Sequence, residues 1–365
     1  MNAHNYLTVL VLALALLPGC RRGGADALVS RESGGLVRVE IEAMAEWTEP
    51  VAEFDLARRF QPVGEFRLGD TRENYIDGPK EFKYYDAGSV LVSGLDRVLR
   101  VSVIDGTPLQ EYGRKGRGPG EFVQVESCFG QADRVYVTDT GSQVHVYEAD
   151  GTSVKDFLLL VPAVQFCELA PLGGEAYLLN YSSLSGKDRY FDVVDAGMKL
   201  VRQGSLHPDD SDLKKGAIRP GASLRFDDRD CVMSGDTLYH VTPQKDRPYW
   251  YFAKKKTKGI HFEKMSNWFF VQASTDSHDF RMVVDVRTGT PVFYAPLKKT
   301  TMTLTTQRGP VTVPATDPED RARFGIPYVR DGEERHIWPV LADRDLLICN
   351  DCQETDYYYC FHLKK

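Results

Sequence analysis

The sequence lacks an apolar run of the twenty or so residues that a helix needs to cross a bilayer. The apolar run near its start, Leu7–Leu17, covers about eleven residues. It also lacks a basic block long enough to follow a phosphate backbone, and its formal net charge is -7. The densest basic cluster, Lys254–Lys258, follows an aromatic strand-like stretch and is predicted to be a solvated turn. Nucleic acid is therefore not an expected partner.

A sustained helical period is nearly absent as well, which disfavours a helical bundle. What is present is a globular composition, with 42% hydrophobic and 27% charged residues in a chain of 365. That mixture supports a packed core.

The first twenty residues have the layout of an export signal. Leu7–Leu17 has the length of a signal-peptide apolar region, and Leu17-Pro18-Gly19-Cys20 follows it directly. This tetrapeptide resembles the lipobox of bacterial lipoproteins, in which the cysteine is acylated. Met1–Tyr6 departs from that pattern because it contains no Lys or Arg. An uncleaved anchor and an ordinary secretory signal are the alternatives.

The resemblance implies a signal peptide over residues 1–19 and a lipid-bearing Cys20. Several acyl chains on Cys20 would give stable membrane anchoring where one chain is marginal. Residues 20–35 are then a polar, glycine-containing tether, and residues 36–365 form the folded domain. The expected location is the cell envelope, outside the cytoplasm, with the membrane as a partner through Cys20.

The cysteines after Cys20 are too scattered for the disulfide framework of a small secreted scaffold. Cys349 and Cys352 have the spacing of half a zinc site, but only Cys360 and His362 lie near as further ligands. We therefore predict no metal and no cofactor. A local disulfide and buried thiols remain open. Cys128 has no triad-like neighbours and is predicted to be a buried small hydrophobe.

From about residue 36 onward, short alternating apolar stretches and frequent turn residues predict an all-β fold. A hairpin pattern recurs about every 40 to 50 residues, which is typical of propeller blades. Six such units can be recognised: Val90–Val92 with Val98–Ile104, Arg134–Asp139 with Gln143–Tyr147, Ala176–Tyr181 with Tyr190–Val194, Thr237–Val241 with Tyr249–Ala253, Trp268–Ala273 with Arg281–Val286, and Asp345–Cys349 with Tyr357–Leu363.

A ring of blades must close, because closure removes exposed sheet edges. Early strands such as Leu36–Ile41 and Val51–Leu56 have no blade of their own. We predict that one of them completes the last blade. The fold prediction is thus a six-bladed β-propeller closed by an N-terminal strand. Residues 295–340 hold more loop than a minimal blade needs and form an irregular later region.

The segment Gly113–Phe122, GRKGRGPGEF, carries the most specific match in the chain. After a strand and Asp105-Gly106, it resembles the signature of six-bladed β-propeller lipoproteins common in Bacteroidetes, which are relatives of NHL-repeat proteins. Arg67–Asp70 with Asn74–Ile76 is similar to that family's segment before its first blade, and Val135–Gly151 to its NHL-like blade. The resemblance covers residues 67–151 and implies a lipid-anchored propeller.

Four glycines within eight positions predict a sharp, ordered turn in this segment. Its exposed amides, together with Arg114, Lys115 and Arg117, form a candidate anion site of the backbone-nest kind. The segment does not end in GK[ST], so it is not a nucleotide P-loop. Glu121 is predicted to pair with a nearby arginine.

No catalytic constellation is placed by the motifs, so the leading hypothesis is a non-catalytic binding or scaffold module for a glycan, peptide or envelope protein. The alternative is a propeller lyase or hydrolase with a metal or a His/Asp site in the central channel. Its candidate catalytic residues are His145 and His240, and further polar candidates are Asp139, His278, His207–Asp210 and Asp227-Asp228. Blade histidines are more often packed core residues, and Asp139 and Asp150 are predicted to cap turns.

Aromatic clusters offer a third hypothesis, a carbohydrate platform. They are Tyr249–Phe252, Trp268–Phe270 and Tyr357–Tyr359. Strand alternation sends about half of such side chains inward, so core packing is the favoured interpretation.

Overall fold

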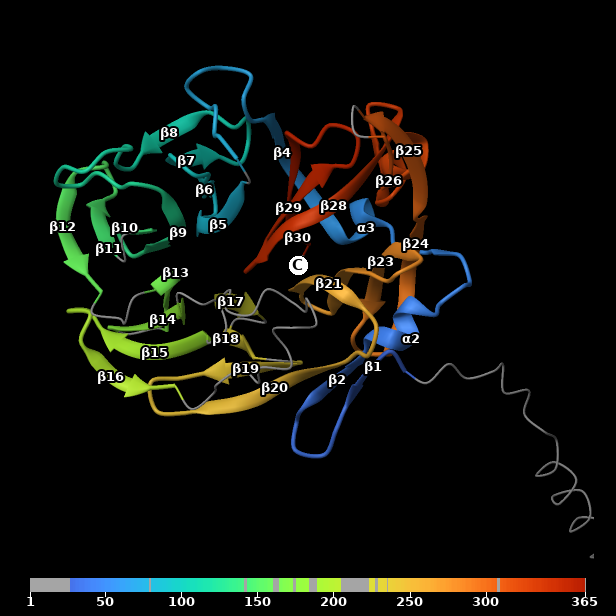
Figure 1. Cartoon of the computed structure of the whole chain (residues 1–365), viewed down its shortest axis with the longest axis horizontal. Coiled ribbons are helices and arrows are strands. Elements are labelled where there is room, and N and C mark those ends of the chain that lie inside the picture. The colour runs from blue at the N-terminus through green and yellow to red at the C-terminus, as the bar shows by residue number, and fades with distance from the viewer. Residues whose placement is uncertain are drawn as a thin grey trace, which may run out of the picture.

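The protein is a six-bladed β-propeller (Figure 1). The computed structural model describes residues 27–78, 80–140, 143–159, 164–172, 175–183, 189–204, 223–226, 229–234, 236–306 and 309–364. Cys20 and the predicted signal peptide lie outside these ranges. None of the helices described is long and apolar enough to cross a membrane.

The first three blades are four-stranded antiparallel sheets, each running outward from the ring's centre in chain order. Blade 1 has β5 (Glu81–Asp86), β6 (Ser89–Ser93), β7 (Val98–Ser102) and β8 (Pro108–Glu111); blade 2 has β9 (Val125–Gln131), β10 (Arg134–Asp139), β11 (Gln143–Glu148) and β12 (Ser153–Leu158); blade 3 has β13 (Val164–Pro171), β14 (Ala176–Ser183), β15 (Arg189–Asp195) and β16 (Leu200–Gln203).

The last three blades recruit strands from the N-terminal segment. Blade 4 has β17 (Ser223–Phe226), β18 (Arg229–Ser234), β19 (Thr237–Val241) and β20 (Asp246–Ala253), extended by β2 (Val37–Glu40) and β1 (Val29–Arg31); blade 5 has β21 (Lys258–Met265), β22 (Trp268–Ser274), β23 (His278–Asp285) and β24 (Thr290–Lys298), extended by β3 (Val51–Ala52); blade 6 has β28 (Glu333–Asp343), β29 (Leu346–Asp351), β30 (Tyr357–Leu363) and β4 (Phe60–Arg67), with β27 (Ile326–Arg330) paired to the start of β28.

Each of the six hairpins expected from the sequence is a hairpin of one blade, so the predicted repeat is confirmed. Ring closure by an N-terminal strand is confirmed as well, but both strands named for it were wrong. Leu36–Ile41 contributes β2, which runs parallel to β20 in blade 4, and Val51–Leu56 contributes β3 in blade 5. The closing strand is β4, which pairs with β30 from Tyr357↔Arg67 to Leu363↔Phe60.

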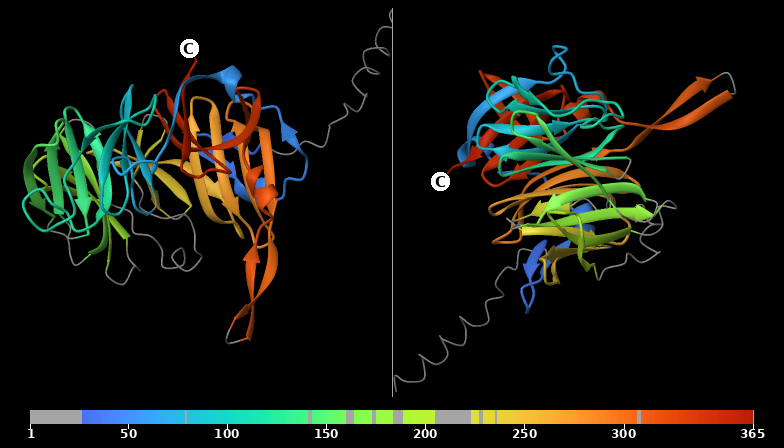
Figure 2. Two further views of the ribbon diagram at one scale, coloured as in Figure 1. Left: turned by 90° about the horizontal axis from the view of Figure 1, so that it is seen from above. Right: turned by 90° about the vertical axis from the view of Figure 1, so that its left-hand side faces the viewer.

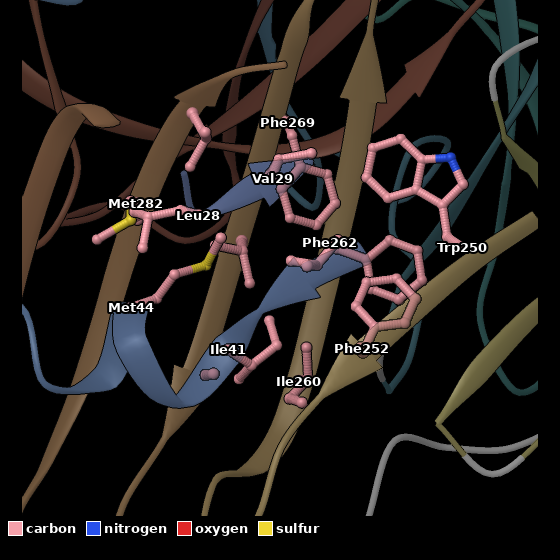
Figure 3. Packing of buried hydrophobic residues seen from close by; sticks show 14 of the residues in the cluster. Leu28, Val29, Ile41, Met44, Trp250, Phe252, Ile260, Phe262, Phe269 and Met282 are labelled. Carbon is pink, nitrogen blue, oxygen red and sulfur yellow. The ribbon is translucent and has the colours of Figure 1, made fainter. Parts of the chain in front are cut away.

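Packing explains why β2 joins blade 4 instead. Its alternate residues Val37 and Val39 are fully buried in a core cluster. Ile41, just after β2, belongs to the same cluster as Trp250 and Phe252 (Figure 3). A strand with this apolar face gains more from the layer between blades 4 and 5 than from an exposed edge. β4 suits the closing position because Gly64 lets the turn after β7 approach closely: a Cβ there would lie 2.3 Å from the Ile104 carbonyl oxygen.

The core is a ring of layers between blades. The buried residues of the described chain form six clusters, each drawing on two neighbouring blades. Phe129 and Tyr136 of blade 2, for example, pack on Tyr177 of blade 3, and the Tyr136 and Tyr177 hydroxyls are 3.0 Å apart. Each sheet buries both faces in this way, so a single blade lacks a complete core.

The predicted aromatic clusters lie mainly in these layers. Trp250, Phe252, Phe269 and Phe270 are at most 1% exposed, whereas Tyr251 and Tyr357 are half-buried. The core interpretation therefore describes most of these side chains.

The irregular region after blade 5 is more ordered than its sequence indicated. β25 (Thr300–Thr306) and β26 (Gly309–Ala315) form a two-stranded hairpin. Helix α5 (Pro318–Ala322) follows, and the side chain of its N-cap residue, Asp317, accepts a hydrogen bond from the Glu319 amide. The hairpin, here called the arm, projects from the propeller (Figure 2). Two further short helices, α2 (Ile41–Ala45) and α3 (Leu56–Arg59), connect the N-terminal strands.

Candidate functional site

The glycine-rich segment Gly113–Phe122 links blade 1 to blade 2 as a tight loop. The Gly116 amide donates to the Phe122 carbonyl at 2.9 Å, and the Phe122 amide donates to the Arg114 carbonyl at 3.1 Å. Gly113 and Gly120 have φ values of 66° and 65°, in the region that favours glycine. A Cβ on Gly113 would lie 2.3 Å from the Tyr147 hydroxyl. Glycine is required there for both reasons.

The amides of this loop already bind a carboxylate, that of Glu121. The Arg117 and Gly118 amides donate to its Oε2 at 3.0 and 2.8 Å, and Arg114 Nε donates to Oε1 at 2.6 Å. Hydrogen bonds from the Gly118 amide and the Arg114 side chain lower the pKa of Glu121. The predicted pairing of Glu121 with a nearby arginine is thus observed.

The side chain of Arg114 and the backbone amide of Arg117 thus already bind an internal anion. An external anion at the same amides would have to displace the Glu121 carboxylate. Ligand binding by Arg114, Lys115 and Arg117 stays a prediction.

His145, the first candidate catalytic residue, lies on β11 behind the loop and is completely buried. Its Nδ1 is 2.9 Å from Asp156 Oδ1, and its Nε2 is 3.5 Å from Asp139 Oδ2. Burial by itself favours the neutral ring, but the hydrogen bonds and charges of the two carboxylates outweigh it and raise the pKa of His145. The structure therefore groups His145 with Asp139, which sequence reasoning had named separately.

Both carboxylates also hold the glycine-rich loop. Asp156 Oδ2 accepts from the Gly120 amide at 3.1 Å, and Asp139 Oδ2 accepts from the Val123 amide at 3.2 Å. The Tyr147 hydroxyl donates to the Gly120 carbonyl at 3.1 Å. We call Asp139, His145 and Asp156, with the loop amides that they bind, the loop anchor. It ties the entry of blade 2 to the blade's own strands.

The other polar candidates lie apart from the loop anchor. His240 is on β19 of blade 4. Its pKa is lowered, mainly by burial and further by the positive charges of Arg229 and Arg247. His278 begins β23 of blade 5, with Nδ1 3.0 Å from the Ser277 hydroxyl. Because blade 3 separates blade 2 from blade 4, His145 and His240 do not form one site. His207–Asp210 and Asp227-Asp228 fall outside the described residues.

The turn role predicted for two aspartates is observed. Asp150 accepts from the Thr152 amide at 2.9 Å, and Asp139 accepts from the Gln143 amide at 3.2 Å. Asp139 combines this role with the loop anchor.

Five cysteines whose side chains the structure describes are not disulfide-bonded. Cys128, Cys231, Cys349 and Cys360 are buried, and Cys352 is half-buried beside Arg281, whose Nη1 is 3.1 Å from Sγ. Cys128 packs between blades 1 and 2, as predicted for a small hydrophobe. Among the residues placed by the structure, no three His, Cys, Asp or Glu side chains are grouped to hold a metal ion.

Sequence reasoning missed one titratable group, Glu263. It is half-buried on β21, the inner strand of blade 5, which lies beside β28 of blade 6. Desolvation raises its pKa to about 7, although the Ala342 amide and the charge of Lys83 act in the opposite direction. Asp343 adds to the increase. Lys83 comes from β5, so charges from the inner strands of blades 6 and 1 act on the pKa of this blade 5 carboxyl.

No sequence signal singles out Glu263. Glu263 follows buried Phe262 in an ordinary strand pattern. The charges of Lys83 and Asp343, which come from other blades, act on it only once the propeller is assembled.

Comparison with family models finds no match, and comparison with curated proteins finds none either. Among solved structures, a candidate exported protein from Bacteroides fragilis superposes with a TM-score of 0.57 at 12% identity, covering 87% of this chain and 98% of that one. The WD40 domain of Pan2 from Neurospora crassa has a TM-score of 0.44 at 10% identity, covering 86% and 97%. BamB from Moraxella catarrhalis has a TM-score of 0.37 at 8% identity, covering 84% and 98%. At these identities the likeness is one of fold alone.

Proposed function

We propose that this chain is a lipid-anchored propeller of the cell envelope that binds another envelope protein and catalyses no reaction. The observation that supports a non-catalytic function is the loop anchor. Its two carboxylates hold the Gly120 and Val123 amides, and His145, which lies between them, is completely buried and inaccessible to a substrate. Such side chains fix a surface loop in one shape, which suits recognition.

The envelope location is supported by Leu17-Pro18-Gly19-Cys20 and the apolar run before it. The Bacteroides fragilis protein of the same fold is itself named as a candidate exported protein. The glycine-rich segment adds its resemblance to lipid-anchored propellers of Bacteroidetes.

Lipid attachment is tested by expressing the full precursor in a Bacteroidetes host supplied with a labelled fatty acid. We expect label on the wild-type chain and none on Cys20→Ser, because the serine variant has no thiol to acylate at that position. Cys352→Ser is the matched control, since it also removes one cysteine, and it should keep the label. Equal labelling of Cys20→Ser and wild type would reject the anchor.

Partner binding is tested by crosslinking intact cells that carry the tagged precursor and identifying what co-purifies. We expect one envelope protein to be recovered with the wild-type chain and lost with Cys20→Ser. Recovery of the same proteins from both would mean that the anchor plays no part in binding. A wild-type chain that recovers none would count against the binding function.

A second candidate function, a propeller enzyme, has one observation in its favour. Glu263 has a pKa of about 7, which suits a group that exchanges protons at neutral pH. The test is turnover of candidate glycan and ester substrates by wild type, Glu263→Gln and His240→Asn. Turnover that Glu263→Gln abolishes would replace the binding proposal.

A further inference from the structure

The arm has two edges that differ in their capacity to pair with another strand. Among the strands that the structure describes, β25 and β26 pair only with each other, in the register Thr306↔Gly309, Thr305↔Pro310, Thr303↔Thr312 and Thr301↔Pro314. Each of the two strands therefore has one outer edge beside which no other described strand lies. Exposed edges of this kind are templates for pairing with other chains, and proteins usually block them.

The register decides which backbone groups point outward. Thr306 and Gly309 close the hairpin with two residues between them, so they are a hydrogen-bonded pair, and such pairs alternate along the arm. Thr301, Thr303 and Thr305 of β25 then direct their N–H and C=O groups away from β26. Pro310, Thr312 and Pro314 direct theirs away from β25. The prolines agree with this assignment, because a proline facing the partner strand would lose a ladder bond.

Only one of the two edges is blocked. On β26, two of the three outward positions are prolines, which have no N–H to donate. On β25, all three outward positions are threonines, whose backbone can donate and accept. Their side chains are exposed on the arm, as is that of Thr312. The arm is thus protected on one side and open on the other.

We propose that the β25 edge is a dimerisation site that pairs antiparallel with β25 of a second copy of this chain. A two-fold axis at Thr303 places Thr303 opposite Thr303 of the second copy, and Thr301 opposite Thr305 of the second copy. Each outward N–H on one strand then faces a C=O on the other. Threonines facing each other across strands are favourable pairs, and like charges would be unfavourable. The arm sequence, Thr300–Ala315, contains Arg308 as its one charged residue, in a chain that is 27% charged.

The position of the arm also supports a second copy of this chain as the molecule that pairs with β25. The arm projects from the propeller (Figure 2), so an edge-to-edge contact need not bring the two blade rings into collision. Two-fold dimers of identical surfaces are also the commonest symmetric assembly. The inference concerns the arm alone and does not depend on the lipid anchor or on the identity of an envelope partner.

Two proline substitutions, one in each member of the cross-strand pair Thr303↔Thr312, test the proposal. Thr303→Pro removes the central donor of the open edge, and Thr312→Pro removes a donor of the edge that is already blocked. Neither removes a bond inside the hairpin, since both residues point outward. Light scattering on the full chain in detergent, over a dilution series, should show a dimer for wild type and for Thr312→Pro. The dimer of Thr303→Pro should dissociate at a concentration at least about tenfold higher than the wild-type dimer does.

Cysteine crosslinking gives an independent measurement. Neighbouring strands are about 4.8 Å apart, so two copies of residue 303 would lie about 5 Å apart and two copies of residue 312 about 14 Å apart. A short bis-maleimide should crosslink Thr303→Cys into a species of twice the chain's mass, and Thr312→Cys much less. The unsubstituted chain sets the background from native thiols. A monomeric wild type, equal crosslinking at both positions, or a dimer that survives Thr303→Pro would overturn the proposal.

Discussion

At the scale of single residues, His145 shows how a candidate catalytic side chain can serve the fold. A buried histidine that faces one carboxylate could act as a base. Here two carboxylates flank the ring; Asp156 also binds the Gly120 amide of the glycine-rich loop, and Asp139 binds the amide of Val123, the residue that follows the loop. When the ring is protonated, its charge is therefore balanced by two carboxylates inside the protein, and removal of the ring would leave Asp139 and Asp156 facing each other.

His145→Asn should lower the free energy of unfolding by about 1.5–3 kcal/mol, the range for hydrogen bonds to charged groups. Because the pKa of His145 is raised on folding, its contribution is fully present below the ordinary value of 6.5 and is lost as pH rises through the folded value. The difference between wild type and His145→Asn in denaturant unfolding should thus be larger near pH 6 than near pH 9.

His261→Asn is the control for this measurement, since His261 is an exposed histidine on β21. A pH-independent difference for His145→Asn, or an equal loss in both variants, would contradict the ion-paired role.

At the scale of elements, the N-terminal segment shows that strands find blades by packing rather than by chain order. β1 and β2 extend blade 4, β3 extends blade 5 and β4 closes blade 6. β4 holds its place through Phe60 and Phe66, which are buried in the layers on either side of blade 6. Its middle, Gly64, allows the backbone at Val103 and Ile104 to lie against it.

Gly64→Ala should weaken ring closure. The added Cβ would lie 2.3 Å from the Ile104 carbonyl oxygen and 2.5 Å from that of Val103, and neither backbone group can rotate away. Overpacking of this kind costs about 1–3 kcal/mol. Calorimetry should show a lower Tm, and hydrogen exchange should show faster exchange of the β30 amides that pair with β4. Gln61→Ala, at an exposed position of β4, should change neither; an unchanged Tm in Gly64→Ala would refute the close approach.

At the scale of the whole molecule, the ring makes an environment that no single blade contains. The charges of Lys83 and Asp343 act on Glu263 because the inner strands of blades 5, 6 and 1 are neighbours in the ring. Desolvation there penalises the charged carboxylate, and the pKa of about 7 records that penalty.

Glu263→Gln should therefore stabilise the protein at alkaline pH. The pKa of Glu263 is higher in the folded chain than its ordinary value of 4.5, so wild type loses stability as pH rises from about 4.5 through 7. Glutamine has no such loss, and we expect its Tm near pH 8 to exceed that of wild type by about 1–3 °C. Near pH 4 the two should agree. Glu334→Gln, at an exposed position of β28, is the control; a lower Tm for Glu263→Gln at pH 8 would contradict the unfavourable burial.

The sequence by itself determined the repeating hairpins, the all-β propeller and the turn at Gly113–Phe122. These follow from local rules, namely alternation along a strand and the backbone freedom of glycine. Tertiary structure alone decided which N-terminal strand closes the ring, the grouping of His145 with Asp139 and Asp156, the environment of Glu263, and the arm. Each depends on segments far apart in the chain, and a strand pattern states which face is apolar without stating what covers it.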